Sequence, residues 1–411
     1  MSGRVDALVI GAGPAGSSTA IRLAQAGWNA VIVEQHEFPR GKVCGECIAA
    51  GSLLLLDELG IGPEFRRVAG PPLRRVGWMS EAGTIVADLP ACSVGPYPFG
   101  RALGRDQLDD LLLRRAKALG VTVLQPAKVS SIRAEPAGFA CDIESMPKSL
   151  LTVHASVVID AHGSWEPGPA LMPELAAARW PRRAADLFGF KATFLDGTLP
   201  ESLLPVLAID GGYGGIVVAD RGRTTLACCI RRDTLRACRA RAPGAQAGEA
   251  VEAYLRRSCL GVREALWDAR RDGTWLAVGP LRPGIHVNAG RGLFRVGNAA
   301  GESHPLIGEG INMALQSAAL LARTLAQQRP SSIRGSVARH LQCTYAAAWR
   351  DEFAARHRIA VAYANVAMRP ALAWPTRSML RRWPTLLTMA ARLAGKARGP
   401  ILRPGVSEVT P

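Results

Sequence analysis

The chain of 411 residues is 48% hydrophobic and 20% charged, a balance that excludes a disordered protein and predicts two or three lobes around separate cores. Its formal net charge is +16, but the arginines are scattered and form no run of five or more. We therefore exclude nucleic acid as a partner, and expect an anionic cofactor, an acidic substrate or an acidic carrier protein to explain the charge.

The N-terminus, MSGRVDALVIGAGPAG, enters a motif directly and shows no signal-peptide pattern. The sequence has no stretch of about 18 uncharged apolar residues, so it predicts no membrane-spanning helix. Its nine cysteines follow no framework spacing. We therefore expect a cytoplasmic protein with reduced thiols.

Residues 5–34 predict a βαβ unit that binds a dinucleotide. An apolar run at 5–10 is typical of a buried parallel strand, a helical pattern follows, and a second apolar strand covers 30–33. The first turn carries G-x-G-x-x-G, and Glu34 closes the second strand 23 residues after Gly11 (34 − 11 = 23). The strand, the helix and the acid together make the motif more specific than its glycines alone.

Each residue type in this unit has a physical reason. The first glycine permits a tight turn, the second lets the backbone approach a pyrophosphate, and the third allows close packing of helix and strand. The helix N-terminus offers N–H groups and a positive dipole end to the phosphates, while Glu34 is placed to accept hydrogen bonds from the adenosine ribose. The predicted contacts are Gly11, Gly13, Ala15, Gly16, Glu34 and Gln35.

Three later segments follow further flavin patterns. They are FGRALGRDQLDDLLLRRAKALGVTV at 99–123, VVIDAHGSW at 157–165, and GLFRVGNAAGESHPLIGEGINMALQSAALLARTLA at 292–326. With the first glycine motif, they resemble the FAD-dependent oxidoreductases of the para-hydroxybenzoate hydroxylase superfamily. The resemblance implies one bound FAD, whose pyrimidine edge faces the N-terminus of the last helix. It implies the following additional contacts: Arg105, Asp160, Gly163, Gly297, Asn298, Gly308, Gly310 and Ile311.

Two positions depart from the family pattern. Asn298 replaces the usual Asp, which keeps a hydrogen-bond acceptor for the ribitol but removes the charge. His162 occupies the position of an Asp that helps to bind the pyridine nucleotide in aromatic hydroxylases. We expect NADPH or NADH as the electron donor, and His162 leaves open whether it binds directly or acts through a separate reductase.

The segment FPRGKVCGECIAAG at 38–51 raises three alternatives: a redox dithiol, half of a metal site, or a loop that wraps the cofactor. It resembles the P-R-x-K-x-C-G-E/G-x-L segment of the branch that holds geranylgeranyl reductase-like enzymes, flavin halogenases and polyketide-cluster flavoproteins. That resemblance implies a flavin-wrapping loop, with Cys44 near the isoalloxazine. The loop residues expected to contact the cofactor are Arg40, Lys42, Cys44 and Gly45.

We predict an α/β fold, with a Rossmann-like FAD-binding domain, an antiparallel β-sheet substrate domain and a helical C-terminal region. The FAD-binding domain would comprise 1–67, 99–184 and 286–330, the substrate domain 68–98 and 185–285, and the helical region 331–411. The C-terminal helices mix Arg with Leu, Met and Trp, a composition that suits peripheral membrane contact, an acyl carrier protein, a cap over the active site, or simple packing on the body.

The first functional hypothesis is a monooxygenase that uses a flavin C4a-hydroperoxide to hydroxylate or epoxidise a hydrophobic or phenolic metabolite, including a polyketide-derived one. The second is a reductase or dehydrogenase acting on a C=C or C–C bond, and the third is a non-catalytic FAD-binding module. Residues 212–216 lack the Trp and Pro of the branch's reductase motif, and the halogenase motif W-x-W-x-I-P is absent. The candidate catalytic residues are His304, Cys44 and Tyr213.

Overall fold

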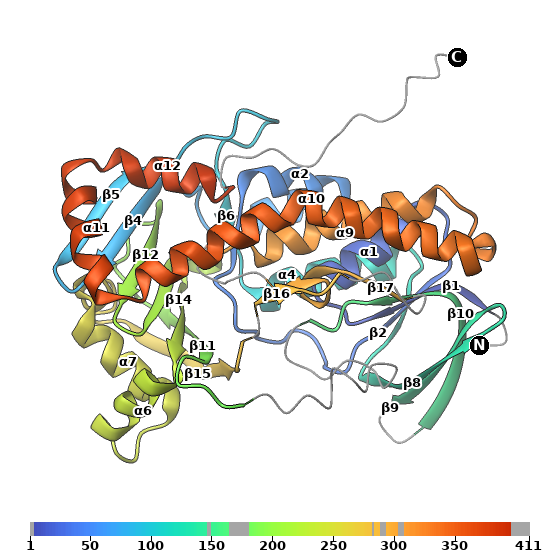
Figure 1. Cartoon of the computed structure of the whole chain (residues 1–411), viewed down its shortest axis with the longest axis horizontal. Helices are drawn as coiled ribbons and strands as arrows, with labels where there is room; N and C mark the ends of the chain where they lie inside the picture. Colours follow the sequence, from blue (N-terminus) through green and yellow to red (C-terminus); the bar gives the residue numbers. More distant parts are fainter. Residues whose placement is uncertain are drawn as a thin grey trace.

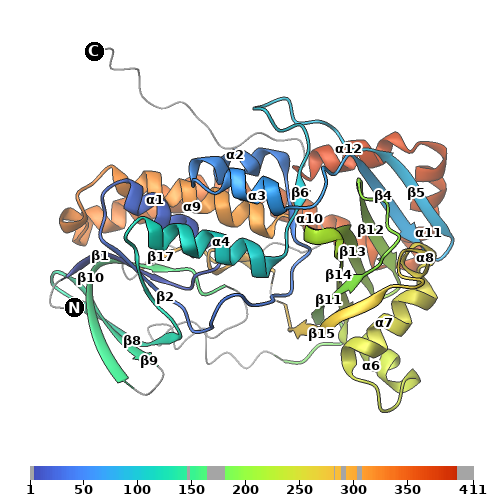
Figure 2. The same cartoon turned by 180° about the vertical axis from the view of Figure 1, so that it is seen from behind.

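The computed structural model describes residues 4–145, 149–163, 181–281, 283–287, 293–302 and 308–395. Two seven-stranded sheets dominate this part of the chain and lie at opposite ends of the molecule (Figures 1 and 2). The predicted α/β fold class is confirmed. No described helix is long and apolar enough to cross a membrane.

The first sheet has the order β7-β2-β1-β10-β9-β8, and β17 pairs with the far end of β10. Its strands are β1 (Val5–Ile10), β2 (Ala30–Val33), β7 (Thr122–Leu124), β8 (Ala127–Glu135), β9 (Gly138–Ser145), β10 (Ser149–Asp160) and β17 (Leu293–Arg295). The pairs β1–β2, β1–β10, β2–β7 and β10–β17 are parallel, so these strands end at one edge. That edge is where a parallel sheet binds its ligand.

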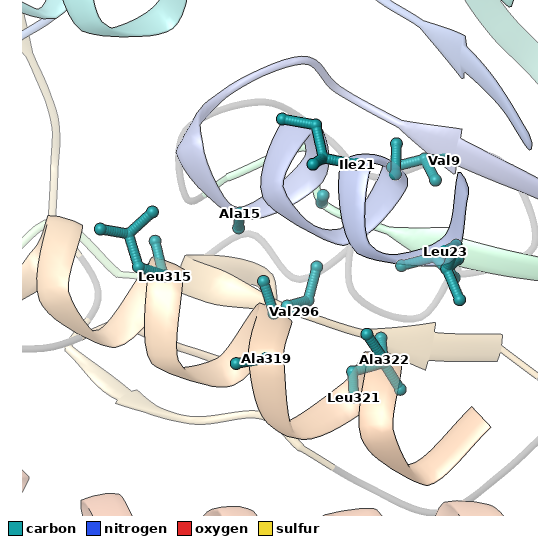
Figure 3. Packing of buried hydrophobic residues seen from close by; sticks show 14 of the residues in the cluster. Val9, Ala15, Ile21, Leu23, Val296, Leu315, Ala319, Leu321 and Ala322 are labelled. Atoms are coloured by element: carbon teal, nitrogen blue, oxygen red, sulfur yellow. The ribbon is translucent and has the colours of Figure 1, made fainter. Parts of the chain in front are cut away.

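Helices cover this sheet. The helices are α1 (Pro14–Gln25), α2 (Ala50–Glu58), α3 (Gly62–Val68), α4 (Arg105–Ala118) and α9 (Gly310–Ala326). Figure 3 shows α1 packed against α9, with Ala15 and Leu23 facing Leu315, Ala319 and Ala322. The small residues on both helices allow this close approach, so the two predicted flavin segments lie side by side.

The second sheet has the order β15-β11-β14-β13-β12-β4-β5. Its strands are β4 (Arg75–Ser80), β5 (Gly83–Asp88), β11 (Leu187–Leu195), β12 (Leu203–Ile209), β13 (Gly212–Val218), β14 (Thr224–Arg231) and β15 (Arg270–Val278). All neighbours are antiparallel except β4 and β12, which run parallel. The expected hairpin from 68–98 thus joins the sheet built from 185–285, while the exact domain boundaries stay predictions.

Both faces of the second sheet are covered. One face packs on α7 (Ala247–Ser258) and α8 (Leu260–Ala265), and α6 (Arg232–Arg241) follows β14 beside α7. The other face packs on the C-terminal helices α10 (Gly335–Ala367), α11 (Pro370–Arg382) and α12 (Thr385–Leu393). The expected helical character of the C-terminal region is therefore confirmed for 335–393.

Short elements connect the two sheets. Two small two-stranded ladders pair β3 (Cys47–Ile48) with β6 (Arg101–Ala102) and β16 (Gly284–Ile285) with β18 (Gly301–Glu302). The 3-10 turns are η1 (Asp220–Gly222), η2 (Gly297–Ala299) and η4 (Pro330–Ser332). The turn η2 carries Gly297 and Asn298 of the predicted cofactor site, and β3 follows the predicted loop residues Cys44 and Gly45.

Candidate flavin-binding site

The glycine turn after β1 has the geometry that its sequence predicts. Gly11 has a φ of +99°, and a Cβ there would lie 2.6 Å from the Ala161 carbonyl oxygen. A Cβ on Gly16 would lie 1.9 Å from the Gly11 carbonyl oxygen, so both positions exclude any side chain. A Cβ on Gly13 would meet only the Arg105 guanidinium, at 3.7 Å. Protein atoms therefore pack tightly against Gly11 and Gly16, while a ligand could approach the backbone at Gly13.

Glu34 lies at the end of β2 and is buried. Its carboxylate accepts a hydrogen bond from the Ala12 N–H at 2.8 Å and one from the His36 N–H at 2.9 Å. The Arg40 guanidinium lies 3.6 Å from the same carboxylate. The acid is thus held beside the glycine turn, where a ribose hydroxyl would meet it. Gln35 follows it, and its side-chain amide lies 3.0 Å from the His36 ring.

The second glycine segment meets the first. A Cβ on Gly297, which has a φ of +62°, would lie 2.6 Å from the Cβ of Ala15. The Gly297 N–H donates to the Ser317 hydroxyl on α9 at 3.1 Å. Asn298 lies in the same 3-10 turn, partly exposed. Tertiary packing therefore brings Ala15, Gly297 and Asn298 to one place from positions nearly 300 residues apart.

The N-terminus of α9 is an open donor site. A Cβ on Gly310 would meet no atom within 4 Å, and no side chain caps the first turn of the helix. Gly308 has a φ of +59°, and Ile311 is buried behind the turn. Asn312 fixes this turn, because its Oδ1 accepts the Ala49 N–H at 2.9 Å. The exposed N–H groups favour a ligand with partial negative charge.

Arg105 is buried and pairs with Asp109 one turn along α4, through two hydrogen bonds of 2.8 and 2.7 Å. Burial opposes its charge, but the Asp109 carboxylate and the Cys44 side chain raise the pKa of Arg105 above its ordinary value. Arg105 therefore links the Cys44 loop to the space above Gly13. Asp109 was not among the predicted site residues, although an acid four positions after the arginine on a helix is a readable signal.

Glu46 is the residue of this region that sequence reasoning missed. It lies between the two cysteines of the loop, is 2% exposed and has a φ of +59°. Its carboxylate pairs with Lys191 of β11 and accepts hydrogen bonds from the Thr225 hydroxyl of β14 at 2.6 Å and the Arg105 N–H at 3.0 Å. Glu46 therefore joins the loop, helix α4 and the second sheet. Nothing in its local sequence identifies Lys191 and Thr225 as its partners.

The two cysteines of the loop have different surroundings. Cys44 is partly exposed, and its sulfur accepts the Glu46 N–H at 3.4 Å, whereas Cys47 is buried in β3 within a separate apolar cluster. None of the nine cysteines forms a disulfide, and no group of described residues could hold a metal ion. A Cβ on Gly45, between them, would meet no atom within 4 Å. This arrangement fits a wrapping loop better than a dithiol.

A second polar group forms where β10 and β17 end. Asp160 is fully buried, its Oδ1 contacts the His162 ring, and Arg295 lies 3.8 Å from its Oδ2. Burial lowers the pKa of Arg295, while Asp160 raises it. A cavity of about 180 Å³ lies beside His162, lined also by Arg40, Lys42 and Leu276. The Lys42 ammonium would lie 3.3 Å from a Cβ on Gly163. This cationic lining suits an anionic ligand.

Of the three candidate catalytic residues, His304 lies outside the described residues. Cys44 lies beside Arg105, on the cofactor side of the loop. Tyr213 of β13 is 1% exposed and belongs to an apolar cluster between the second sheet and the C-terminal helices. Its hydroxyl contacts Cys229 of β14, and burial raises its pKa well above the ordinary value. The structure therefore does not gather Cys44 and Tyr213 into one cluster.

The residues present fit FAD. Glycines 13, 45 and 310 leave open the volume that a Cβ would fill, and the N-termini of α1 and α9 both lack a side-chain cap. The first helix end suits the pyrophosphate, and the second suits the pyrimidine edge of the flavin. The buried Asp160 Oδ2 has no hydrogen-bond partner among the described residues, so a polar ligand atom would satisfy it.

Comparison with known proteins agrees with this site. Residues 4–168 match the FAD binding domain family. The menaquinone reductase of Mycobacterium tuberculosis (strain ATCC 25618 / H37Rv) is 27% identical over 359 residues, which cover 82% of this chain and 83% of that protein. The fold is also that of a myxobacterial chondrochloren halogenase (TM-score 0.72, 20% identity, 96% of each chain covered). A geranylgeranyl bacteriochlorophyll reductase-like protein from Thermoplasma acidophilum has a TM-score of 0.69 at 16% identity, over 95% of this chain and 99% of that one.

These matches and the geometry agree with the resemblance drawn from the motifs. One chain combines the glycine turn after β1, the second glycine segment at 297–301 and the two sheets, which is the combination that the resemblance implied. The N-terminal part of the chain is thus similar to an FAD binding domain, the chain as a whole is similar to FAD-dependent oxidoreductases, and its fold is that of flavin halogenases and geranylgeranyl reductase-like proteins.

Proposed function

We propose that the protein is a reductase that adds a hydride and a proton across a C=C bond of a large apolar substrate of isoprenoid type. The likeness to a menaquinone reductase over most of both chains supports this substrate class. NADPH or NADH is the proposed source of electrons, either directly or through a separate reductase.

The observation that carries the proposal is the position of Tyr213. Its hydroxyl is buried against Cys229, inside an apolar cluster, and the Glu302 carboxylate is close enough to influence it. Glu302 follows directly after the second glycine segment of the cofactor site. Burial raises the pKa of Tyr213 well above its ordinary value and that of Cys229 to about 12, so both groups keep their protons near neutral pH.

This arrangement supports a role for Tyr213 in the reduction of a C=C bond. The hydride to one carbon would come from reduced FAD, held by the residues described above. Tyr213 holds a proton that can pass from its oxygen to the other carbon, and solvent replaces that proton after turnover. The apolar side chains around Tyr213, among them Leu187 and Leu204, would exclude water from a substrate bound there and would suit an isoprenoid chain.

Oxygenation is the second candidate, and one observation favours it. The indole Nε1 of Trp78 is buried in the same cluster and has no hydrogen-bond partner among the described residues. A phenolic oxygen on a substrate would accept that hydrogen bond, as a hydroxylase of phenolic metabolites requires. The same cluster would exclude water from the oxygen chemistry.

A single anaerobic experiment separates the two candidates. The flavin of the purified holoprotein is reduced without oxygen and mixed with an isoprenoid quinone in detergent, and flavin absorbance is followed by stopped flow. We expect reoxidation by the substrate and a product whose isoprenoid chain, and not its quinone ring, has gained two hydrogens. Tyr213→Phe should slow this step by about 10² to 10⁴, the usual contribution of a general acid.

A different result of the same experiment would favour the monooxygenase. If no C=C substrate reoxidises the flavin without oxygen, and isotopically labelled O₂ instead places one oxygen atom in a phenolic substrate, the protein is a monooxygenase. An unchanged rate in Tyr213→Phe would remove Tyr213 from the proposed mechanism. Anaerobic mixing with NADPH and NADH tests the electron donor in the same instrument.

A further inference from the structure

The outward side of helices α11 and α12 is a surface that the proposed reaction does not use. The two helices lie along the outside of β4 and β5, at the end of the molecule away from the first sheet (Figures 1 and 2). Two hydrogen bonds join these helices to the β4–β5 hairpin. The Thr388 hydroxyl donates to the Asp88 carbonyl at 2.7 Å, and the Arg377 guanidinium donates to the Ala82 carbonyl at 3.0 Å. The inner sides of the helices are therefore already occupied by the hairpin.

Large exposed apolar side chains gather along these two helices. Of the nine exposed large hydrophobic residues among those described, four lie within 15 residues (379–393): Met379 at 43%, Trp383 at 58%, Met389 at 59% and Leu393 at 57%. Met389 and Leu393 are four residues apart on α12, so this pair shares one helix face, whereas Met379 lies in the last turn of α11 and Trp383 directly follows that helix. We call these four residues the outer face.

Helix α12 is apolar on two opposite sides. Leu387 and Ala391, also four residues apart, are buried toward the second sheet. At 100° per residue, this buried pair points about 160° away from the exposed pair Met389 and Leu393. A surface helix of a soluble protein needs only the inner stripe, so the outer pair has no role in packing this chain.

The C-terminal segment itself carries charge of one sign. Residues 353–407 contain ten basic residues and no Asp or Glu, the basic ones being Arg356, Arg358, Arg369, Arg377, Arg381, Arg382, Arg392, Lys396, Arg398 and Arg403. Arg381, Arg382 and Arg392 are exposed beside the outer face. None of these three pairs with a carboxylate within the described part of the chain.

We propose that the outer face docks on an anionic phospholipid bilayer, with α11 and α12 lying flat in the headgroup region. Apolar side chains on one side of a short helix, flanked by arginines, bind such an interface through burial of apolar area and attraction to anionic lipid. An acidic carrier protein would satisfy the arginines but would leave four large apolar side chains without a partner. The bilayer therefore accounts for both parts of the surface.

Docking here would bring the bilayer close to the cluster around Tyr213. Leu387 and Ala391 on the inner side of α12 belong to that same cluster. One helix thus separates the outer face from the apolar interior of the second lobe. The inference does not depend on the proposed reaction, because membrane binding and flavin chemistry are measured separately.

The test is co-sedimentation of the full-length holoprotein with vesicles. One set of vesicles is phosphatidylcholine alone, and the other is an equal mixture of phosphatidylcholine and phosphatidylglycerol. We expect binding to the anionic vesicles that falls with added salt, and little binding to the neutral ones. Changing Arg381, Arg382 and Arg392 together to Gln should weaken binding about 100-fold, since each cation contributes roughly fivefold. Met389→Ser with Leu393→Ser should weaken it about tenfold or more.

The chain offers a matched control on the opposite side of the same lobe. Helix α6 carries the exposed residues Arg236, Arg239 and Arg241, so their triple change to Gln lowers the net charge equally. Trp267→Ser, at a side chain 73% exposed, is the matched apolar control. All substituted side chains are exposed, and retention of FAD will verify that each variant is folded.

Three results would overturn the proposal. The first is the absence of wild-type binding to anionic vesicles. The second is an equal loss of binding in the α6 and outer-face charge variants, which would mean that net charge alone acts. The third is tight, saturable binding of a purified acyl carrier protein through Arg381, Arg382 and Arg392 in place of vesicle binding.

Discussion

Breaking the buried pair of Glu46 and Lys191 tests how the two lobes are joined. The side chains are 2% and 6% exposed, and Glu46 also accepts hydrogen bonds from Thr225 and from the Arg105 N–H. Glu46→Gln keeps the shape of the side chain but removes its charge, which leaves the Lys191 ammonium buried without a counter-charge. Loss of one partner of a buried ion pair costs about 3–5 kcal/mol.

The expected change in melting temperature follows from the size of the chain. An unfolding entropy of roughly 2.1 cal/mol/K per residue gives about 0.9 kcal/mol/K for 411 residues. Glu46→Gln should therefore lower Tm by about 3–6 °C. Lys191→Met added to Glu46→Gln should recover most of this loss, because it removes the buried ammonium that Glu46→Gln leaves without a counter-charge. Differential scanning calorimetry of both variants measures these changes.

An exposed pair on the same sheet provides the control. Asp196 and Arg270 lie 2.9 Å apart at 63% and 74% exposure, beside the ends of β11 and β15. Asp196→Asn should shift Tm by about 1 °C or less, because exposed pairs contribute about 0–1 kcal/mol. If Glu46→Gln melts like this control, or if Lys191→Met fails to restore stability, then the pair does not join the lobes as described.

Three further predictions concern the cofactor site and the buried titratable groups. Gly13→Val should abolish FAD retention, because its branched side chain would fill the space between the turn and Arg105; a variant that purifies fully yellow would refute the site. Cys343, the one exposed cysteine of nine, should react first with a thiol reagent, while Cys229 stays protected until the protein unfolds; mass spectrometry of the labelled protein measures the order. The free energy of unfolding should fall as the pH rises above about 9. Burial raises the folded pKa of Cys229 to about 12 and that of Tyr213 well above its ordinary value, so the unfolded chain loses these protons first. A Tm that stays constant from neutral to alkaline pH would contradict this.

Much of the cofactor site could be predicted because its signals are local. Gly11 and Gly16 must be glycine because a Cβ at either position would collide with backbone atoms of the turn or of the residues after β10. Their spacing in the sequence reflects that geometry. The same holds for Glu34, whose place at the end of β2 follows from the length of the βαβ unit. The roles proposed for single residues such as Asn298 and Gly163 stay predictions.

The second lobe was less accessible to sequence reasoning. An antiparallel sheet within 185–285 could be predicted from strand-like runs separated by Asp-Gly and Arg-Gly turns, and the structure has strands β11 to β14 there. The parallel pairing of β4 with β12 could not, because it joins strands more than 120 residues apart and leaves no local pattern. Tyr213 similarly reads as an ordinary strand aromatic until its neighbours are known.

The sequence by itself determined the class of cofactor, because a dinucleotide is bound mainly by backbone groups whose geometry glycines set locally. Only the tertiary structure decided the role of the CGEC loop, since Glu46 meets Lys191 and Thr225 from strands 145 and 179 residues away. The tertiary structure also decided which apolar residues of the C-terminal helices are buried and which are exposed. The physical reason is the same in both cases: a buried charge and an exposed apolar side chain are defined by what surrounds them, and chain neighbours do not supply those surroundings.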